Sequence, residues 1–273
     1  MGRRIARAIF AAAAAGATIA TFGLTAVGAA GAATDPARVA DNHHFVGYHN
    51  ASARGPAVVV TTRHFAGYHT APNNQRLFRY VATTLRVSAC QLPIAPNKNP
   101  IADMELFSRN WDAQIGVLCN GGANTIGYFD QKSATTHATG TFRLTPRVGD
   151  RLRISISRNV SGHRDSFKVT NLRTRRSQTV RVTTSTAVRY RHAFVGSLIG
   201  SNADVMPLPA TNTLVWTFQS SRVVTTGGVR GTLRGPWAAA KEIDRTVGGT
   251  LVMYPGKLSS TGASFSTYLH AAP

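Results

Sequence analysis

Short segments in which apolar and polar residues alternate recur along most of this chain, and they restrict the folds open to it. Leu152, Ile154 and Ile156 alternate with arginines and serines over residues 151–157, and the same period appears over residues 112–119. A two-residue period places all the apolar side chains of a strand on one face of a sheet. The pattern predicts a chain built from half-buried β-strands.

Turn-forming residues separate these segments at regular intervals. Strands are expected over residues 57–62, 80–89, 111–118, 141–144, 151–157, 167–172, 179–183, 188–195, 214–218, 223–226, 251–254 and 264–268. Residues 101–110 show no clear period, and residues 237–243 alone have a helical pattern. Many short strands with almost no helix indicate an all-β sandwich or barrel.

The N-terminus has the pattern of a secretion signal. Three arginines within the first seven residues precede an apolar stretch over residues 8–27 and a small-residue cleavage site at residues 30–32. Residues 1–33 are predicted to be a cleaved signal peptide, although an uncleaved anchor helix is the alternative reading. A short leader (34–42) and a single β-sandwich domain (43–273) are expected to follow. The mature chain is thus predicted to be secreted, with no transmembrane segment.

A histidine-containing repeat lies at the start of this domain, in the strand region 43–63 and just beyond it. The hexapeptide at residues 44–49 recurs, with one substitution, at residues 64–69. Five histidines therefore lie within 27 residues, and paired strands could bring them together as metal ligands. Because no Cys or carboxylate joins them at a ligand spacing, structural or surface histidines are favoured. We expect neither a metal nor a cofactor.

The charge balance is strongly basic. The chain has 31 Lys and Arg against 11 Asp and Glu, and loss of the three arginines in the predicted signal leaves a formal charge of +17. By strand alternation Arg151 and Arg153 share a face, as do Arg189 and Arg191, which predicts an anion-binding surface. An anionic cell-wall polymer or polysaccharide is the expected partner, although a merely solvated basic face is the simpler alternative. No aromatic residues are interleaved for base stacking.

Two cysteines, Cys90 and Cys119, are expected to form a disulfide in an exported chain. Closure of a loop of this length contributes about 3 kcal/mol in the chain-entropy model.

Several segments, in order, resemble the glutamic peptidases, or eqolisins. They are HFAGYHTAP with RYVATTLRVSAC, QIGVLCNGG, RVGDRLRISIS, VTNLRTRRSQTV, PLPATNTLVWTF and SSTGASFSTYL, which together span much of residues 64–269. The resemblance implies a concanavalin A-like β-sandwich of two curved antiparallel sheets. It also implies peptide-bond cleavage by a glutamine and a glutamate.

The resemblance places Gln114 at the family's catalytic glutamine and Phe194 at its glutamate. A phenyl ring transfers no proton, and neither glutamate of the chain, Glu105 or Glu242, lies in a matching segment. The family segment upstream of the glutamine is also missing. The leading hypothesis is therefore a secreted, non-catalytic binding or surface-associated protein.

Two alternatives stay open. The first is an acid endopeptidase in which Gln114 works with a substitute carboxylate, Asp204 or Asp112, or with His192 as a base. The second is a carbohydrate-binding sandwich, which exposed Trp111, Trp216 or Tyr128 would support.

Overall fold

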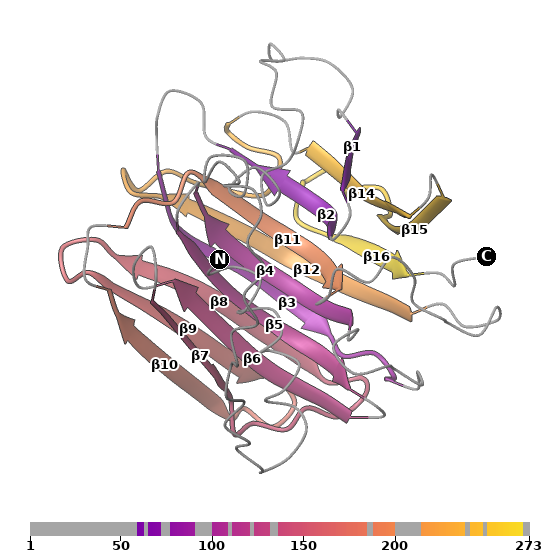
Figure 1. The fold of residues 1–273 in the computed structure, drawn as a ribbon, viewed down its shortest axis with the longest axis horizontal. Helices are drawn as coiled ribbons and strands as arrows, with labels where there is room; N and C mark the ends of the chain where they lie inside the picture. The colour runs from indigo at the N-terminus through magenta and orange to yellow at the C-terminus, as the bar shows by residue number, and fades with distance from the viewer. Residues whose placement is uncertain are drawn as a thin grey trace, which may run out of the picture.

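The computed structural model describes residues 59–62, 65–71, 77–90, 100–108, 111–120, 123–131, 136–184, 188–199, 214–237, 241–247 and 250–269. The predicted signal peptide and leader, the first copy of the histidine repeat and Asp204 lie outside these residues. Within them the chain forms sixteen strands and no helix (Figure 1). No helix of the described residues is long and apolar enough to cross a membrane.

The strands form two layers. The first sheet has the order β10 (Ser177–Thr183), β9 (Arg164–Asn171), β8 (Arg151–Asn159), β3 (Phe78–Arg86), β12 (Leu214–Thr225) and β16 (Phe265–Leu269). The second has the order β15 (Thr250–Pro255), β14 (Lys241–Val247), β2 (Phe65–Thr70), β11 (His192–Ile199), β4 (Pro100–Phe107), β5 (Asp112–Asn120), β6 (Ala123–Gln131) and β7 (His137–Thr141). Two short strands lie off these paths: β1 (Val59–Thr62) pairs in parallel with β14, and β13 (Arg230–Gly231) pairs with β12. The pairings within the two sheets are antiparallel, so the predicted concanavalin A-like sandwich is confirmed.

The main core lies between the two sheets. Leu152, Ile154 and Ile156 of β8 point into it and are fully buried, as their alternation predicts. The apolar residues of β5 that alternate with Gln114 are buried in the same core. Because these strands have a two-residue period, the residues between them project from the opposite face of each sheet.

Two expectations for the strands are corrected. The helical pattern at residues 237–243 is not realised in the part described from residue 241, because Lys241–Val247 is β14, paired with both β2 and β15. Strand pairing there outweighs the helix propensity of Lys241 and Glu242. The segments 214–218 and 223–226 belong to one strand, β12, interrupted by an irregularity between Gln219 and Arg222. Ser220 has a φ of 54° there, and the buried Ser221 lies 3.0 Å from Thr83 of β3.

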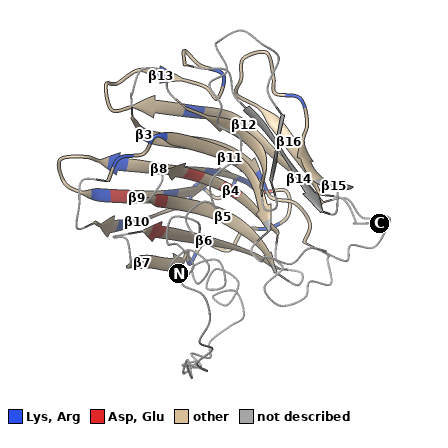
Figure 2. Ribbon diagram, turned by 45° about the horizontal axis from the view of Figure 1, so that its top comes forward, with Lys and Arg blue, Asp and Glu red and all other residues tan. Residues whose placement is uncertain are grey.

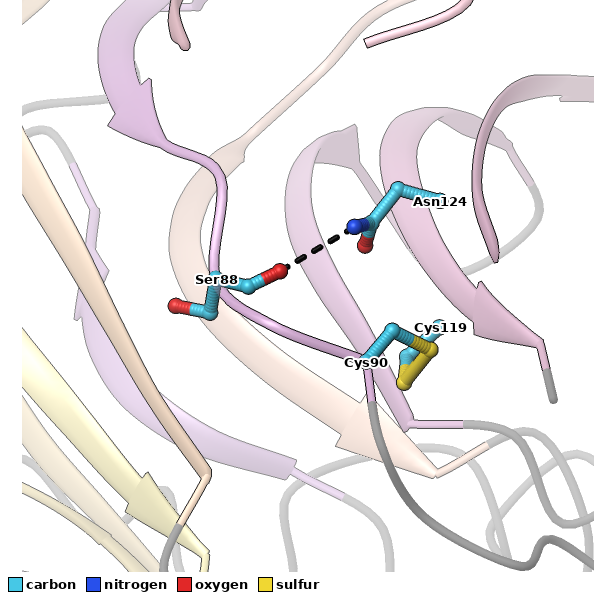
Figure 3. The surroundings of a disulfide bond; sticks show 4 residues. All are labelled: Ser88, Cys90, Cys119 and Asn124. Atoms are coloured by element: carbon cyan, nitrogen blue, oxygen red, sulfur yellow. Dashed lines mark hydrogen bonds between the residues drawn. A yellow bond between two sulfur atoms is a disulfide. The ribbon is translucent and has the colours of Figure 1, made fainter. Parts of the chain in front are cut away.

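The predicted disulfide is confirmed and joins the two layers (Figure 3). Cys90 follows β3 of the first sheet, Cys119 belongs to β5 of the second, and their Cα atoms are 5.2 Å apart. Asn124 of β6 donates a hydrogen bond to the Ser88 carbonyl at 3.0 Å beside it. The cross-link is compatible with an extracellular location.

Candidate active site

The hairpin of β4 and β5 brings two carboxyl groups beside an amide. In its register Glu105 pairs with Gln114 and Asp103 pairs with Gly116. Met104 and its even-numbered neighbours on β4 enter the main core, so Asp103 and Glu105 project from the other face of the second sheet. We call this surface, formed by β2, β11, β4, β5 and β6, the site face.

The amide group of Gln114 bonds to both carboxyl groups. Its Nε2 donates to Glu105 Oε1 and to Asp103 Oδ2, each at 2.9 Å. All three side chains are buried, with exposed fractions of 7% for Gln114, 5% for Glu105 and 0% for Asp103. Two carboxylates this close in a desolvated place cannot both be charged at low cost, so the pair retains a proton.

Burial favours the protonated form of Asp103. Its pKa is raised to about 7, chiefly by burial and to a smaller extent by the negative charge of Asp112. Hydrogen bonds with Glu105 and Gln114 oppose the rise. The second oxygen, Oδ1, is buried without a hydrogen-bond partner among the described atoms, and it lies 3.3 Å from the position that a Cβ on Gly116 would take.

A row of glycines crosses the site face beside these groups. Gly67 of β2, Gly196 of β11, Gly116 of β5 and Gly127 of β6 are consecutive partners in the register, with Asp103 of β4 between the second and the third. We call these four residues the glycine row. The backbone there carries no side chains of its own, so neighbouring groups or a ligand can approach it closely.

Phe194 of β11 covers one end of the glycine row. It is the register partner of Glu105, is fully buried and meets Phe65 edge-on at 5.5 Å between ring centroids. Its ring is so close to the row that a Cβ at Gly196 would lie 2.5 Å from Cζ, and one at Gly67 would lie 3.0 Å from Cε2. Phe194, Glu105 and Gln114 therefore follow one another across three neighbouring strands.

Two histidines lie beside Phe194 on the same face: His69 of β2 is its register partner, and His192 is at the next position on β11. His69 Nε2 and His192 Nδ1 are 3.0 Å apart, so one ring donates a hydrogen bond to the other. The ring of Phe107 stacks on His192 at 4.9 Å between centroids, and His69 is 1% exposed. His192 shares the face of Phe194, as strand alternation predicts.

Of the two substitute carboxylates, only Asp112 lies among the described residues. Asp112 begins β5 on the face of Gln114, is half-buried and pairs with Phe107 in the register. Gln114 lies two residues further along β5, where its amide bonds to Asp103 and Glu105. Asp204 lies outside the described residues.

The aromatic residues suggested for carbohydrate binding pack inward. Trp216 is 1% exposed within the main core, and Trp111 and Tyr128 pack against that core. These three residues therefore give no support to the carbohydrate-binding alternative.

The four arginines predicted to bind anions lie in two separate places. Arg151 pairs with Arg86 at the end of β3, and Arg153 is two residues further along β8. Arg189 and Arg191 flank Tyr190, which bridges to Phe78 at the start of β3. The ends of β3 are about 25 Å apart at the rise of a β-strand. Arg151 and Arg153 share an exposed face of β8. The pair of Arg189 and Arg191 lies at the other end of β3, so the two pairs form no common surface.

Sequence reasoning missed Asp103 and set Glu105 aside. Both belong to residues 101–110, which show no clear period because apolar residues occupy both faces of β4. A second apolar cluster lies on the site face: Phe65, Ile101, Phe107, Leu118, Phe129, Phe194 and Leu198. Two features of the sequence could have indicated them. They are acidic residues two positions apart in an otherwise apolar run, and a short connection leads from this run to the strand of Gln114.

No group of three His, Cys, Asp or Glu side chains is placed to hold a metal ion in the part of the chain that the structure describes. The first copy of the histidine repeat is not included in that part.

Comparison with known proteins gives a fold and no sequence relative. No family model matches the chain, and no curated protein matches its sequence. Among solved structures, scytalido-glutamic peptidase with a peptide-based transition state analog superposes with a TM-score of 0.55 and 15% identity, over 75% of this chain and 97% of that chain. The same enzyme with another transition state analog inhibitor gives a TM-score of 0.55 and 13% identity, over 77% and 98%.

This chain has the glutamic-peptidase fold. The resemblance read from the sequence is thereby confirmed at the level of architecture, for most of the length of both proteins.

Proposed function

We propose that this protein hydrolyses peptide bonds in acid, with Glu105 and Gln114 as its reacting pair and Asp103 as a second carboxyl group. The observation that carries the proposal is the pair of 2.9 Å hydrogen bonds from Gln114 to Glu105 and Asp103. The glutamic-peptidase fold supports it, because solved proteins with that fold bind peptide-based transition state analogs. Glu105, which sequence reasoning set aside, replaces Asp112 and Asp204 as the preferred carboxylate.

Each group has a chemical task in this proposal. The Glu105 carboxylate accepts a proton from a water molecule as the water oxygen attacks the carbonyl carbon of the peptide. An N–H of Gln114 turns from its carboxylate to the developing oxyanion. Asp103 holds the proton that the leaving amine takes when the C–N bond breaks. The products are one carboxylic acid and one amine, and the proton accepted from water replaces the one delivered.

The protonation of Asp103 sets the upper pH limit of this reaction. With a pKa raised to about 7, Asp103 carries its proton in acid and loses it as the pH rises through that value. We therefore expect the rate to fall on the alkaline side, where the pair becomes doubly charged and the acid is lost.

A non-catalytic binding scaffold is the second candidate, and two observations favour it. Glu105 and Gln114 are 5% and 7% exposed, so a substrate reaches them only if groups on the site face move. Phe194, at the position that the family resemblance gives to a glutamate, fills the space over the glycine row with a fully buried ring.

Acid digestion separates these two candidates. The purified protein is incubated with an unfolded protein substrate between about pH 2 and pH 8, beside Glu105→Gln and Gln114→Ala. Gln219→Ala, on the other sheet, and Glu242→Gln, the remaining glutamate, serve as matched controls. Cleavage that both site variants lose and both controls keep supports the hydrolase. No cleavage by the unaltered protein at any pH leaves the binding scaffold.

A further inference from the structure

The first sheet presents an outward surface that carries positive charge in every row and no acidic side chain among its described residues. Successive rows across the strands are set by the register: Arg230, Val224, Tyr80, Ser157, Ser166 and Arg181 in one, and Arg222, Ala82, Ser155, Lys168 and Thr179 in the next. Arg153 and then Arg86 with Arg151 follow in the next two rows. Blue stretches along β12, β3, β8, β9 and β10 mark these cations in Figure 2.

A hollow of about 660 Å³ opens at one end of this surface, between β3, β12 and β13. Arg79, Arg222 and Arg230 line it together with the hydroxyl-bearing Tyr80, Ser157 and Thr232. Its volume is in the range of ligand sites, roughly 300–1,000 Å³. We call it the arginine pocket.

Local backbone irregularities build the arginine pocket. Arg79 has no partner on β12, because Val224 pairs with Tyr80 and Thr225 pairs with Phe78, so Arg79 is the extra residue of a β-bulge. The other irregularity, between Gln219 and Arg222, precedes Arg222 on β12. Bulges redirect side chains and are frequent beside functional sites.

Three charges of the arginine pocket have no carboxylate partner among the residues that the structure describes. A fourth arginine on its wall, Arg158, is neutralised by the buried Asp165 at 2.9 Å, with side chains 1% and 0% exposed. Arg79, Arg222 and Arg230 are exposed, and the two ion pairs found among the described residues involve none of them. Three guanidinium groups around one hollow repel one another, and an anion removes that repulsion.

We propose that the arginine pocket and the cationic rows beside it bind a linear phosphate polymer that has no bases. Guanidinium groups bind phosphate oxygens through paired hydrogen bonds, and the hydroxyl groups of Tyr80 and Ser157 supply further donors. Rows two residues apart lie about 7 Å from each other, so an extended polyanion that runs along the strands meets at least one cation in each row. Tyr80 is the one aromatic residue in these rows, which leaves single-stranded nucleic acid without a stacking platform.

This surface is independent of the carboxyl pair. The arginine pocket belongs to β3, β12 and β13 of the first sheet, whereas Glu105 and Gln114 belong to the second sheet and project from its site face. The inference therefore stands whether or not the protein hydrolyses peptides.

Binding of inorganic polyphosphate tests the proposal. Fluorescence anisotropy of end-labelled polyphosphate is measured against the intact protein at several salt concentrations, and against the triple variant Arg79→Gln/Arg222→Gln/Arg230→Gln. We expect the triple variant to bind at least about 30-fold more weakly at low salt, and the slope of log K against log salt to fall by about 2 to 3.

A control triple variant separates the arginine pocket from net charge. Arg143→Gln/Arg147→Gln/Arg176→Gln removes three exposed charges that do not line the pocket. We expect this variant to bind polyphosphate within about 3-fold of the intact protein. An equal loss in both triple variants overturns the proposal, as does tighter binding of a thymidine homopolymer or of polyglutamate than of polyphosphate. Circular dichroism confirms that each variant is folded.

Discussion

Glu105 of β4 accepts a hydrogen bond from Gln114 of β5 at 2.9 Å, in a buried position between two strands of a glutamic-peptidase fold. On its other side in the register lies Phe194. The carboxyl group beside Gln114 thus comes from β4. The sequence resemblance placed the glutamate at Phe194, on the neighbouring strand β11.

Removal of the Glu105 carboxylate is expected to abolish acid hydrolysis. Glu105→Gln keeps the size of the side chain and replaces the base by an amide, so kcat is expected to fall at least about 100-fold. The measurement is the initial rate of peptide cleavage near pH 4, with Glu242→Gln as the control. Full activity in Glu105→Gln would rule out the role assigned to this residue.

Asp103 is expected to make the protein less stable as the pH rises. Its folded pKa, about 7, is above the unfolded value of 3.8, so between these values the folded state holds a proton that the unfolded state has lost. The contribution is neutral in strong acid and becomes a loss of roughly 4 kcal/mol above pH 7. Urea unfolding from pH 4 to pH 8 measures it.

The Asp103→Asn variant provides the comparison. It has no ionisable group at this position, so its free energy of unfolding is expected to fall less steeply between pH 4 and pH 7 than that of the unaltered protein. Part of the slope remains, because the pKa of Asp165 is also raised, to about 6, chiefly by burial. Equal slopes in the two proteins would contradict the assignment of the proton to Asp103.

Loss of the cation beside Asp165 is expected to destabilise the fold severely. Asp165 Oδ2 accepts hydrogen bonds at 2.9 Å from Arg158 and from the hydroxyl of Tyr190. Arg158→Met leaves a carboxylate buried without its charge partner and should cost about 3–5 kcal/mol. In Arg173→Gln, where the cation bonded to Asp150 is 54% exposed, the loss should stay below about 1 kcal/mol. Similar losses in both variants would refute the distinction.

Removal of Phe194 is expected to open the glycine row. Phe194→Ala should lower the free energy of unfolding by about 3–5 kcal/mol, because a fully buried ring is lost. If the protein is a hydrolase, kcat/KM should rise for peptides, since the ring no longer covers Gly67 and Gly196. Comparison with Phe167→Ala, which removes an equally buried ring from the main core, identifies effects that come from destabilisation alone.

Loss of the disulfide is expected to destabilise the sandwich of the two sheets. Cys90→Ala/Cys119→Ala should lower the free energy of unfolding by about 3 kcal/mol, because the cross-link restricts the unfolded chain. Urea unfolding of this variant, beside the oxidised protein, gives the difference. An unchanged midpoint would show that the cross-link contributes nothing to stability.

The strands of the chain can be predicted from the sequence where one face of a strand is buried and the other is exposed to solvent. β8 is such a strand, and its inward and outward residues follow the alternation of Leu152, Ile154 and Ile156. β4 is buried on both faces, so its period disappears and Asp103 and Glu105 cannot be assigned to a face without the register. Long-range pairing supplies that register, and it also makes a strand of Lys241–Val247 in spite of a helical composition.

Function was harder to read because the site depends on relations across strands. Gln114 was found through its local sequence, whereas its two partners are nine and eleven residues away and meet it only through the hairpin. The arginine pocket depends on two irregularities in strand pairing, and no sequence motif indicates either of them.

The hydrogen bonding of β16 to β15 has a consequence for self-association. It joins the two layers into one continuous path of strands that begins at β10 and ends at β7. A sandwich of two separate sheets has four edge strands at which another chain could add a strand. This continuous path has two edge strands. One of them, β10, carries Arg181, and the other, β7, has five residues, and both features discourage intermolecular strand addition.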